Sequence, residues 1–439
     1  MADNNVIDMV DFGEPEKENS IIKVIGVGGG GGNAVNHMYR SGIHNVSFVL
    51  CNTDNQALND SPVPVLLQLG KEGLGAGNRP AKAREAAEES LSDIQNMLND
   101  GTKMAFITAG MGGGTGTGAA PVIARVSKEL GILTVGIVTI PFRFEGDRKI
   151  DQALDGVEEM AKHVDALLVI NNERLREIYS DLNLLDAFGK ADDTLSVAAK
   201  SIAEIITVHG LINLDFNDVK TVLKDGGVAI MSTGYGEGEG RVKKAIDDAL
   251  NSPLLNDKDI YNSKKILLWI CFSNEKGGKE TLTMEEMNDV NDFMGHFGSE
   301  FELKWGVAVD PELDSRVKVT ILATGFGIED VDGMNNHIKK HTEEEVRRIA
   351  EEEERAAERL DRRNRYYGKD STNTAYKRRP HIFRFRPEDL DNEDIIIAVE
   401  DTPTYKRTKQ MLREIQGTGN EDNEDDAPKD TVQGVISFT

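Results

Sequence analysis

The feature that most constrains this chain is a run of six glycines, two threonines and a methionine at Gly110–Gly118. An apolar stretch of strand type, Met104–Ala109, precedes the run, and Pro121–Leu130 has the apolar spacing of an amphipathic helix. Glycines let the backbone approach a ligand closely, and a helix start adds partial positive charge. The hydroxyls of Thr115 and Thr117 can donate further hydrogen bonds. The order of strand, glycine run and helix therefore predicts a site for an anion such as phosphate rather than a flexible linker.

A second unit of the same kind lies near the start of the chain. Ile21–Val27 is of strand type, five glycines and Asn33 follow it, and Ala34–Arg40 has the pattern of a helix start. We expect a second anion site at this turn. A dinucleotide-binding fingerprint, which is a weak signal when taken alone, is matched by Gly26, Gly28 and Gly31.

Strands and helices alternate after this unit. The strand Val46–Cys51 ends in polar residues, of which Asn52 or Asp54 could bond a ribose hydroxyl, and Asp54 fits a solvated turn equally well. This alternation predicts an α/β fold with a mostly parallel sheet, helices on both faces and ligands beyond the carboxyl ends of the strands. The further predicted elements are helices at Pro80–Leu98 and Ile150–His163 and strands at Ile132–Ile140 and Ala166–Ile170.

A long helical pattern at Leu184–Val208 separates this domain from a second one. The second domain extends from about Val219 to about Ile328 and is expected to be a smaller α+β domain. Its predicted strands are Val228–Met231, Lys265–Phe272, Trp305–Val309 and Lys318–Ala323, and its predicted helices are Gly240–Asn251 and Met284–Phe297.

The composition limits the compartment and the partners. A formal net charge of -25 argues against nucleic acid or an anionic membrane as a main partner. Cys51 and Cys271 lie in apolar runs, and we expect both to be buried free thiols. Met1–Ser20 lacks the basic and apolar regions of a signal peptide, and no apolar run is long enough to cross a bilayer. We therefore expect a soluble, cytoplasmic protein without direct membrane insertion.

The composition changes again near Glu343. Glu343–Arg365 alternates acidic and basic residues and can form at most a solvated helix. A basic, weakly amphipathic island at Asp401–Leu412 interrupts the acidic tail. We interpret the island as a partner-binding peptide on a flexible tether, in which about 70 disordered residues would span about 45 Å. A chance fluctuation in a tail is the simpler alternative.

Three kinds of phosphate binder compete. A P-loop nucleotide hydrolase needs a glycine loop that ends in Gly-Lys-Ser/Thr, and neither run has this ending. An NAD(P)-dependent oxidoreductase would use Gly26–Gly31, but it leaves the second run without a role and offers no clear catalytic group. A mononucleotide triphosphate held between the two runs accounts for both. Such a protein could be an enzyme or a scaffold that polymerises without hydrolysis.

Both glycine runs resemble those of the tubulin/FtsZ family of GTPases, whose bacterial members act in cell division. The segment Gly112–Gly118 resembles the family signature, and the resemblance continues in order from about Ile21 to about Ile328. Further matching segments are Asn52–Asp54, Pro141–Gly146, Leu185–Gly189 and Asn213–Asp218, and Asp401–Leu412 resembles the C-terminal partner peptide of the family.

The resemblance implies a tubulin-like fold with a parallel Rossmann-like nucleotide-binding domain, a long central helix, a smaller α+β C-terminal domain and a disordered tail. It implies GTP or GDP as ligand, with Mg²⁺ bound mainly through the phosphates, and a head-to-tail homopolymer that forms the division ring at mid-cell. Membrane-anchored and regulatory division proteins would bind Asp401–Leu412. The phosphates would lie against Gly29, Gly30, Gly31, Gly32, Asn33, Gly114, Thr115 and Gly116.

The same resemblance implies how the nucleoside is held. Glu145 would bond the ribose with Lys149 beside it, Phe188 would stack on guanine, and Asp193 would bond the N1–H and N2–H₂ edge. Two positions depart from the family. Arginine usually stands where this chain has Lys149, so either this lysine or the neighbouring Arg148 makes the contact. Asparagine usually stands at the position of Asp192, where two adjacent carboxylates can raise each other's pKa.

Three polar residues, Asn213, Asp215 and Asp218, follow the long helix. A helix over 184–208 would be about 37 Å long, so these carboxylates cannot reach the nucleotide of the same chain. They can reach the nucleotide of the next subunit in a head-to-tail stack. A helix N-cap is the simpler interpretation of this pattern, whereas the resemblance implies catalysis in trans, with GTP hydrolysed only on polymerisation.

These predictions divide the chain into seven parts. They are a flexible lead-in at 1–20, a GTP-binding domain at 21–183, a central helix at 184–208, a C-terminal GTPase-activating domain with the catalytic loop at 209–331, a charged flexible linker at 332–400, a partner-binding peptide at 401–412 and an acidic tail at 413–439. In the peptide, Tyr405–Arg407 stands where the family prefers an apolar residue, leucine and arginine, which leaves the identity of the partners open.

Overall fold

The computed structural model describes residues 20–43, 45–179, 183–208, 210–252, 260–274, 281–297, 301–331 and 333–367, together with 382–383, 385, 392–404, 406–407, 411–412 and 415. The predicted lead-in at 1–20 lies outside the described residues except for Ser20. Most of 368–391 and most of the acidic tail also lie outside them. The chain divides into two compact units, Met1–Glu344 and Glu345–Thr439.

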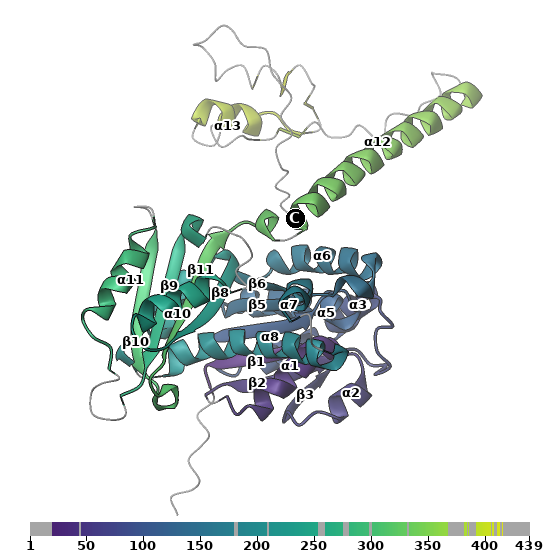
Figure 1. The fold of residues 1–439 in the computed structure, drawn as a ribbon. Coiled ribbons are helices and arrows are strands. Elements are labelled where there is room, and N and C mark those ends of the chain that lie inside the picture. Colours follow the sequence, from purple (N-terminus) through teal and green to yellow (C-terminus); the bar gives the residue numbers. More distant parts are fainter. Residues whose placement is uncertain are drawn as a thin grey trace, which may run out of the picture. The chain divides into compact units, whose positions relative to one another are not determined.

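The first unit is built on one sheet of 11 strands in the order β3-β2-β1-β4-β5-β6-β8-β11-β9-β10-β7 (Figure 1). The first six strands of this order pair in parallel, and their order is that of doubly wound nucleotide-binding folds. The predicted parallel α/β architecture is therefore confirmed. These strands are β1 Ile22–Val27, β2 Ser47–Asn52, β3 Val65–Gln68, β4 Met104–Gly110, β5 Leu133–Ile140 and β6 Ala166–Asn171.

Helices cover both faces of the sheet because the strands are apolar on both sides, and each face has its own buried core. One face carries α1 Gly28–Arg40, α2 Asn55–Asn59, α7 Asn172–Ile178, α8 Leu184–Thr207 and α9 Phe216–Leu223. The other face carries α3 Pro80–Glu89, α4 Leu91–Leu98, α5 Thr115–Glu129, α6 Asp147–Ala161, α10 Arg241–Leu250 and α11 Glu286–Met294. Cys51 and Cys271 are buried and free, as predicted, and burial raises the pKa of each thiol to about 12.

The second half of the sheet mixes parallel and antiparallel pairs. β8 joins the first half by pairing in parallel with β6, and its antiparallel partner is β11. One sheet therefore continues through the two predicted domains, and their division at the central helix stays a prediction. Apart from short β7, the strands overlap the predicted ones: β7 Gly210–Ile212, β8 Gly227–Gly236, β9 Lys265–Phe272, β10 Glu302–Val309 and β11 Val317–Phe326.

Several helix boundaries differ from the predictions, most of all at the glycine-rich segments. α1 begins at Gly28 instead of Ala34, with a first turn made of glycines, and α5 begins at Thr115 instead of Pro121, with a first turn of two threonines and two glycines. The helix predicted at Pro80–Leu98 is two helices that meet at Ser90. The buried Ser90 hydroxyl accepts a hydrogen bond of 2.9 Å from the N–H of Gly70, which ties the break to the preceding glycine-rich loop.

The packing of the first unit continues past its predicted end near Val331. α12, Met334–Tyr367, begins with the fully buried Met334, and the imidazole of His337 lies 3.0 Å from the carboxylate of Asp155. Beyond Glu344 the same helix belongs to the second unit. The predicted linker at 332–400 is thus helical over 334–367 and again in α13, Glu393–Glu400.

The second unit contains a small apolar cluster of its own. The cluster consists of the buried side chains Phe383, Ile395, Val399 and Ile415. The Arg407 guanidinium donates hydrogen bonds of 2.7 Å to the carbonyls of Val399 and Thr402, and so satisfies backbone acceptors at the C-terminal end of α13. Part of the predicted partner peptide is therefore attached to a helix that precedes it.

Candidate functional site

The two glycine runs meet at the switch point of the sheet. β1 and β4 are neighbours, and the chain leaves both at the edge where doubly wound sheets bind their ligands. The backbones of the two runs touch. A side chain at Gly28, where φ is +72°, would come within 2.8 Å of the Gly116 nitrogen, and one at Gly30 would come within 3.2 Å of Gly110 Cα. Glycine at these positions is required by the packing of one run on the other.

A different set of glycines faces open space. A Cβ atom at Gly29, Gly32 or Gly113 would meet no atom of the described residues within 4 Å beyond its chain neighbours. Both helices also begin without a side-chain cap, since neither Val27 nor Gly114 has a side chain that can accept a hydrogen bond from the first turn. Uncapped N–H groups at two adjacent helix starts form a site for an anion, and the open glycines allow it to approach the backbone.

The threonines of the second run have different surroundings. The Thr115 hydroxyl lies 2.7 Å from that of Thr53 at the rim of the site. Thr117 is buried, and its hydroxyl accepts a hydrogen bond of 2.9 Å from the Gly112 N–H, so it shapes the loop instead of facing the ligand as predicted. The Gln152 amide donates to the carbonyls of Gly112 and Gly113 at 3.0 and 2.8 Å. Sequence reasoning missed Gln152, because nothing in its neighbourhood marks it as a loop support.

The predicted ribose-binding pair comes together in the turn after β5. The Glu145 carboxylate accepts a hydrogen bond of 3.0 Å from the Phe142 N–H and lies 3.2 Å from the Lys149 ammonium. The adjacent Arg148 is exposed. Lys149 is therefore paired with Glu145, and Arg148 is an exposed cation of the same turn.

Phe188 belongs to a cluster of three aromatic rings. Its ring centroid lies 5.2 Å from that of the buried Phe142 in an edge-to-face arrangement, and Phe144 stacks on Phe142 at 5.1 Å. Phe188 itself is 40% exposed. The cluster holds an exposed ring near the start of α8, beside the turn that carries Glu145, and the stacking of Phe188 on guanine stays a prediction.

Asp193 is oriented by a histidine from the neighbouring helix. His37 Nε2 lies 3.1 Å from the Asp193 carboxylate, and His37 Nδ1 lies 3.2 Å from the Ser196 hydroxyl. Asp192 beside it is in a different state: burial, and secondarily the Asp193 charge, raise the pKa of Asp192 to about 6. Asn52 and Asp54, the other predicted nucleoside contacts, lie near the first run, but Asp54 caps α2 by accepting from the N–H groups of Gln56 and Ala57.

Asn213, Asp215 and Asp218 lie beyond the opposite end of α8. This helix of 24 residues is about 36 Å long and begins beside the aromatic cluster. Asp215 and Asp218 form a capping box at the start of α9, as the simpler interpretation predicted. The Asn213 side chain accepts a hydrogen bond of 2.7 Å from the Gly210 N–H. The structure thus brings these three residues together and separates them from every predicted nucleotide contact.

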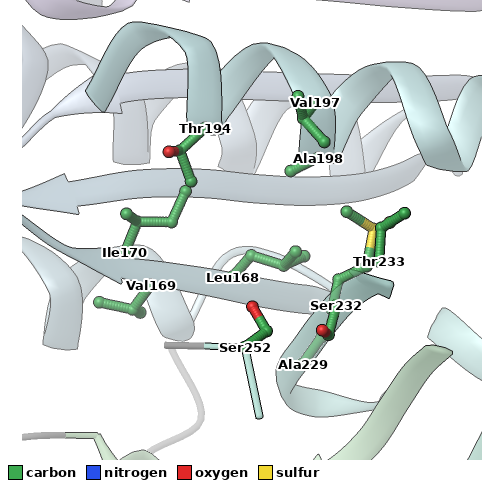
Figure 2. Close-up of a pocket in the computed structure, with 11 residues that line it drawn as sticks. Leu168, Val169, Ile170, Thr194, Val197, Ala198, Ala229, Ser232, Thr233 and Ser252 are labelled. Atoms are coloured by element: carbon green, nitrogen blue, oxygen red, sulfur yellow. The ribbon is translucent and has the colours of Figure 1, made fainter. Parts of the chain in front are cut away.

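A small apolar cavity of about 100 Å³ lies between these two ends. Figure 2 shows Thr194, Val197 and Ala198 of α8 facing β6, while Ser232 and Thr233 come from β8. Its lining includes no residue of either glycine run. This cavity is therefore separate from the anion site.

Comparison with known proteins decides the family. A model of the Tubulin/FtsZ family GTPase domain matches residues 21–180, a model of the FtsZ family C-terminal domain matches 227–327, and a model of the FtsZ C-terminal segment matches 377–422. The cell division protein FtsZ of Porphyromonas gingivalis (strain ATCC BAA-308 / W83) is 52% identical over 411 residues, which are 90% of this chain and 87% of that protein. The chain belongs to the FtsZ family.

Other members of the FtsZ family agree with this assignment. The cell division protein FtsZ of Azotobacter vinelandii is 47% identical over 71% of this chain and 78% of its own. A solved structure named "FtsZ dimer, empty (M. jannaschii)" superposes with a TM-score of 0.64 at 39% identity, over 71% of this chain and 89% of that one.

Membership of the FtsZ family settles the activity and the nucleotide. The protein is a GTPase of the cell-division cytoskeleton, and its nucleotide is guanine-based. The oxidoreductase alternative is not supported, because the matched domain that contains both glycine runs is a GTPase domain. The predicted tubulin-like fold is confirmed. Among the described helices, none combines the length and the apolar character needed to cross a bilayer.

Proposed function

We propose that the protein assembles head to tail and hydrolyses GTP at each junction, where the glycine runs of one subunit meet Asp215 and Asp218 of the next. The observation that carries this proposal is the separation within one chain. The carboxylates lie beyond the C-terminal end of α8, a helix about 36 Å long, whereas the proposed base contacts Phe188 and Asp193 lie in its N-terminal half. A water molecule cannot be activated across that distance, so a second subunit must supply the carboxylates.

The proposed contacts follow the geometry of the site. The phosphates lie against Gly29–Asn33 and Gly114–Gly116, where uncapped helix starts offer N–H donors. Glu145 and Lys149 bond the ribose, the exposed Phe188 ring stacks on guanine, and Asp193 accepts from its N1–H and N2–H₂ groups. The fixed N–H groups and the Thr115 hydroxyl suit phosphate oxygens, so Mg²⁺ would be held chiefly through the phosphates, where it neutralises their charge.

Exposed apolar side chains at both ends support self-association. Leu74, in the glycine-rich loop that pairs with Asp54, is 84% exposed. At the other end, Leu211 of β7 is 70% exposed, and it lies just before Asn213 in the chain. Large apolar side chains next to polar site residues are typical of protein–protein contacts. Asp215 and Asp218 would then enter the neighbouring subunit's site together with this apolar surface.

Two experiments test the shared site. GTP turnover per subunit should rise from near zero as the protein concentration passes a threshold, and turnover that stays constant down to dilute monomer would exclude the proposal. The Asp218→Ala variant should bind GTP without hydrolysing it, and the Asp193→Ala variant should bind GTP poorly. A mixture of the two inactive variants should regain turnover, because one supplies the nucleotide and the other the carboxylates. A mixture that stays inactive would contradict catalysis in trans.

The C-terminal segment has a separate proposed role. Membrane-attached and regulatory division proteins would bind Asp401–Leu412 and so hold filaments at the division site at mid-cell. Its basic and partly apolar composition within an acidic tail supports this role. The contact of Arg407 with α13 extends the proposed binding segment toward the small apolar cluster of Phe383, Ile395 and Val399.

A further inference from the structure

A lysine distant in sequence lies against the proposed catalytic carboxylates. Lys304 is on β10, and its ammonium lies 3.1 Å from Asp218 Oδ1. The other oxygen of Asp218, Oδ2, accepts a hydrogen bond of 3.1 Å from the Asp215 N–H. Both oxygens of Asp218 are therefore engaged, one by a backbone donor and one by a cation from a different element.

The two carboxylates of this cap are not equivalent. Asp215 Oδ1 accepts a hydrogen bond of 2.9 Å from the Asp218 N–H, which completes the capping box. A capping box needs only these two backbone donors, so helix capping does not explain the lysine. The lysine instead places a cation directly on the Asp218 carboxylate. Lys304 makes its direct contact with Asp218, and Asp215 is exposed.

We propose that Lys304 is a positioning residue of the shared GTPase site, which fixes the ionised Asp218 so that Asp215 can orient the attacking water at the neighbouring subunit. This inference rests on the proposed function in trans. The lysine acts through Asp218 and need not touch the nucleotide. It comes from β10, so the sheet of the second half, and not α9 alone, sets the geometry of the carboxylates.

The charges around Asp218 support this assignment. Burial alone would raise the pKa of Asp218, but the Asp215 N–H and the Lys304 ammonium outweigh it and lower the pKa. Glu302 on the same strand acts on Lys304 and holds its pKa up, as Asp218 does more strongly. On β9, Lys265 donates to the carbonyls of Thr221 and Lys224 at the far end of α9. On β11, Lys318 pairs with Glu204 of α8. Of these three lysines, Lys304 is thus the one that forms an ion pair with Asp218.

The matched pair Lys304→Met and Lys265→Met tests the inference. Both variants remove one lysine that contacts α9, and only the first removes the partner of Asp218. We expect Lys304→Met to lower kcat about five- to tenfold and to move the acid limb of the kcat–pH profile upward by about half a unit, because Asp218 loses a cation that keeps it ionised. GTP affinity and the critical concentration should stay unchanged. Lys304→Arg should restore the kcat–pH profile of the unmodified protein, and Lys265→Met should leave that profile unchanged.

The outcomes separate this inference from the proposed function. If Asp218→Ala is inactive while Lys304→Met keeps both kcat and the acid limb, the positioning role is excluded and catalysis in trans stands. Equal losses of kcat in Lys304→Met and Lys265→Met would show a general effect on α9 and would also exclude the positioning role of Lys304. If Asp218→Ala retains turnover, the proposed function itself fails. Lys304→Gln, which keeps a polar side chain, serves as the second variant if thermal melting shows that Lys304→Met is misfolded.

Discussion

Two adjacent carboxylates near the start of α8 have different surroundings. Asp193 is 42% exposed and is oriented by His37, so it can accept hydrogen bonds from a base without a large loss of hydration. Asp192 is only partly exposed, and burial together with the Asp193 charge raises its pKa to about 6. At neutral pH Asp192 is ionised in an environment that favours its protonated form, which costs free energy of folding.

Asp192→Asn should therefore stabilise the protein in a pH-dependent way. The pKa of the Asp192 carboxyl rises from an ordinary value of 3.8 to about 6 on folding, so the folded state binds this proton more tightly than the unfolded state. Stability is then lost as the pH rises from about 4 through 6. We expect the variant to gain on the order of 2 kcal/mol in the free energy of unfolding at pH 7 and almost nothing near pH 4. Urea unfolding at both pH values measures this, and an equal gain at both would contradict the assigned burial.

At the scale of an element, α1 shows two reasons for glycine within one turn. A Cβ atom at Gly31 would collide with the Thr108 carbonyl, whereas one at Gly32 would meet open space. Gly31→Ala should therefore destabilise the fold. Gly32→Ala should stabilise the helix by up to about 1 kcal/mol and weaken GTP binding at least about tenfold, because the methyl group occupies the surface proposed for phosphate. Thermal melting without nucleotide and a GTP titration check both effects, and a Gly32→Ala variant with unchanged affinity would place the phosphates elsewhere.

The helix starts show what the sequence could predict. The strands β1 and β4 and the glycine runs were recognisable because apolar strand patterns and glycine runs are local signals. Glycine has low helix propensity, so the sequence placed the start of α1 at Ala34, whereas the helix begins at Gly28 and packs its glycines Gly30 and Gly31 closely against Gly110 and Thr108. The capping box of Asp215 and Asp218 was predictable from its spacing. The pairs His37–Asp193 and Lys304–Asp218 were not, because they join residues far apart in the sequence.

On the scale of the whole molecule, one sheet connects the nucleotide end with the carboxylate end. β6 pairs with β8 over Ala166–Leu168, and α8 packs on the same face as α1 and α9. Bringing the carboxylates beyond the C-terminal end of α8 to the glycine runs of the same chain would require breaking this sheet. Hydrolysis is therefore expected to depend on the arrival of a neighbouring subunit and not on an internal movement, which makes turnover a measure of assembly.

The last prediction concerns the chain beyond the first unit. The first unit extends to Glu344, and the part of α12 that follows, 345–367, is about 35 Å long if it stays helical. The tether proposed for Asp401–Leu412 thus includes a charged helix over the segment whose composition allowed a solvated one, with ion pairs such as Arg365–Asp361 at 2.6 Å along it. Such a helix can hold a binding peptide away from the filament surface without contributing to the GTPase site.

Deleting everything after Asp370 should leave GTP turnover and filament formation nearly unchanged, because the glycine runs, Asp215 and Asp218 all lie in the first unit. Recruitment to vesicles that carry a membrane-attached division partner should be lost. A shorter deletion, which removes only 401–439, should lose recruitment to the same extent if the peptide is the binding element. Sedimentation of filaments and co-flotation with the vesicles measure the two properties separately. Loss of assembly in either truncation would show that the C-terminal segment takes part in the filament contact, and this would contradict its proposed role as a tether.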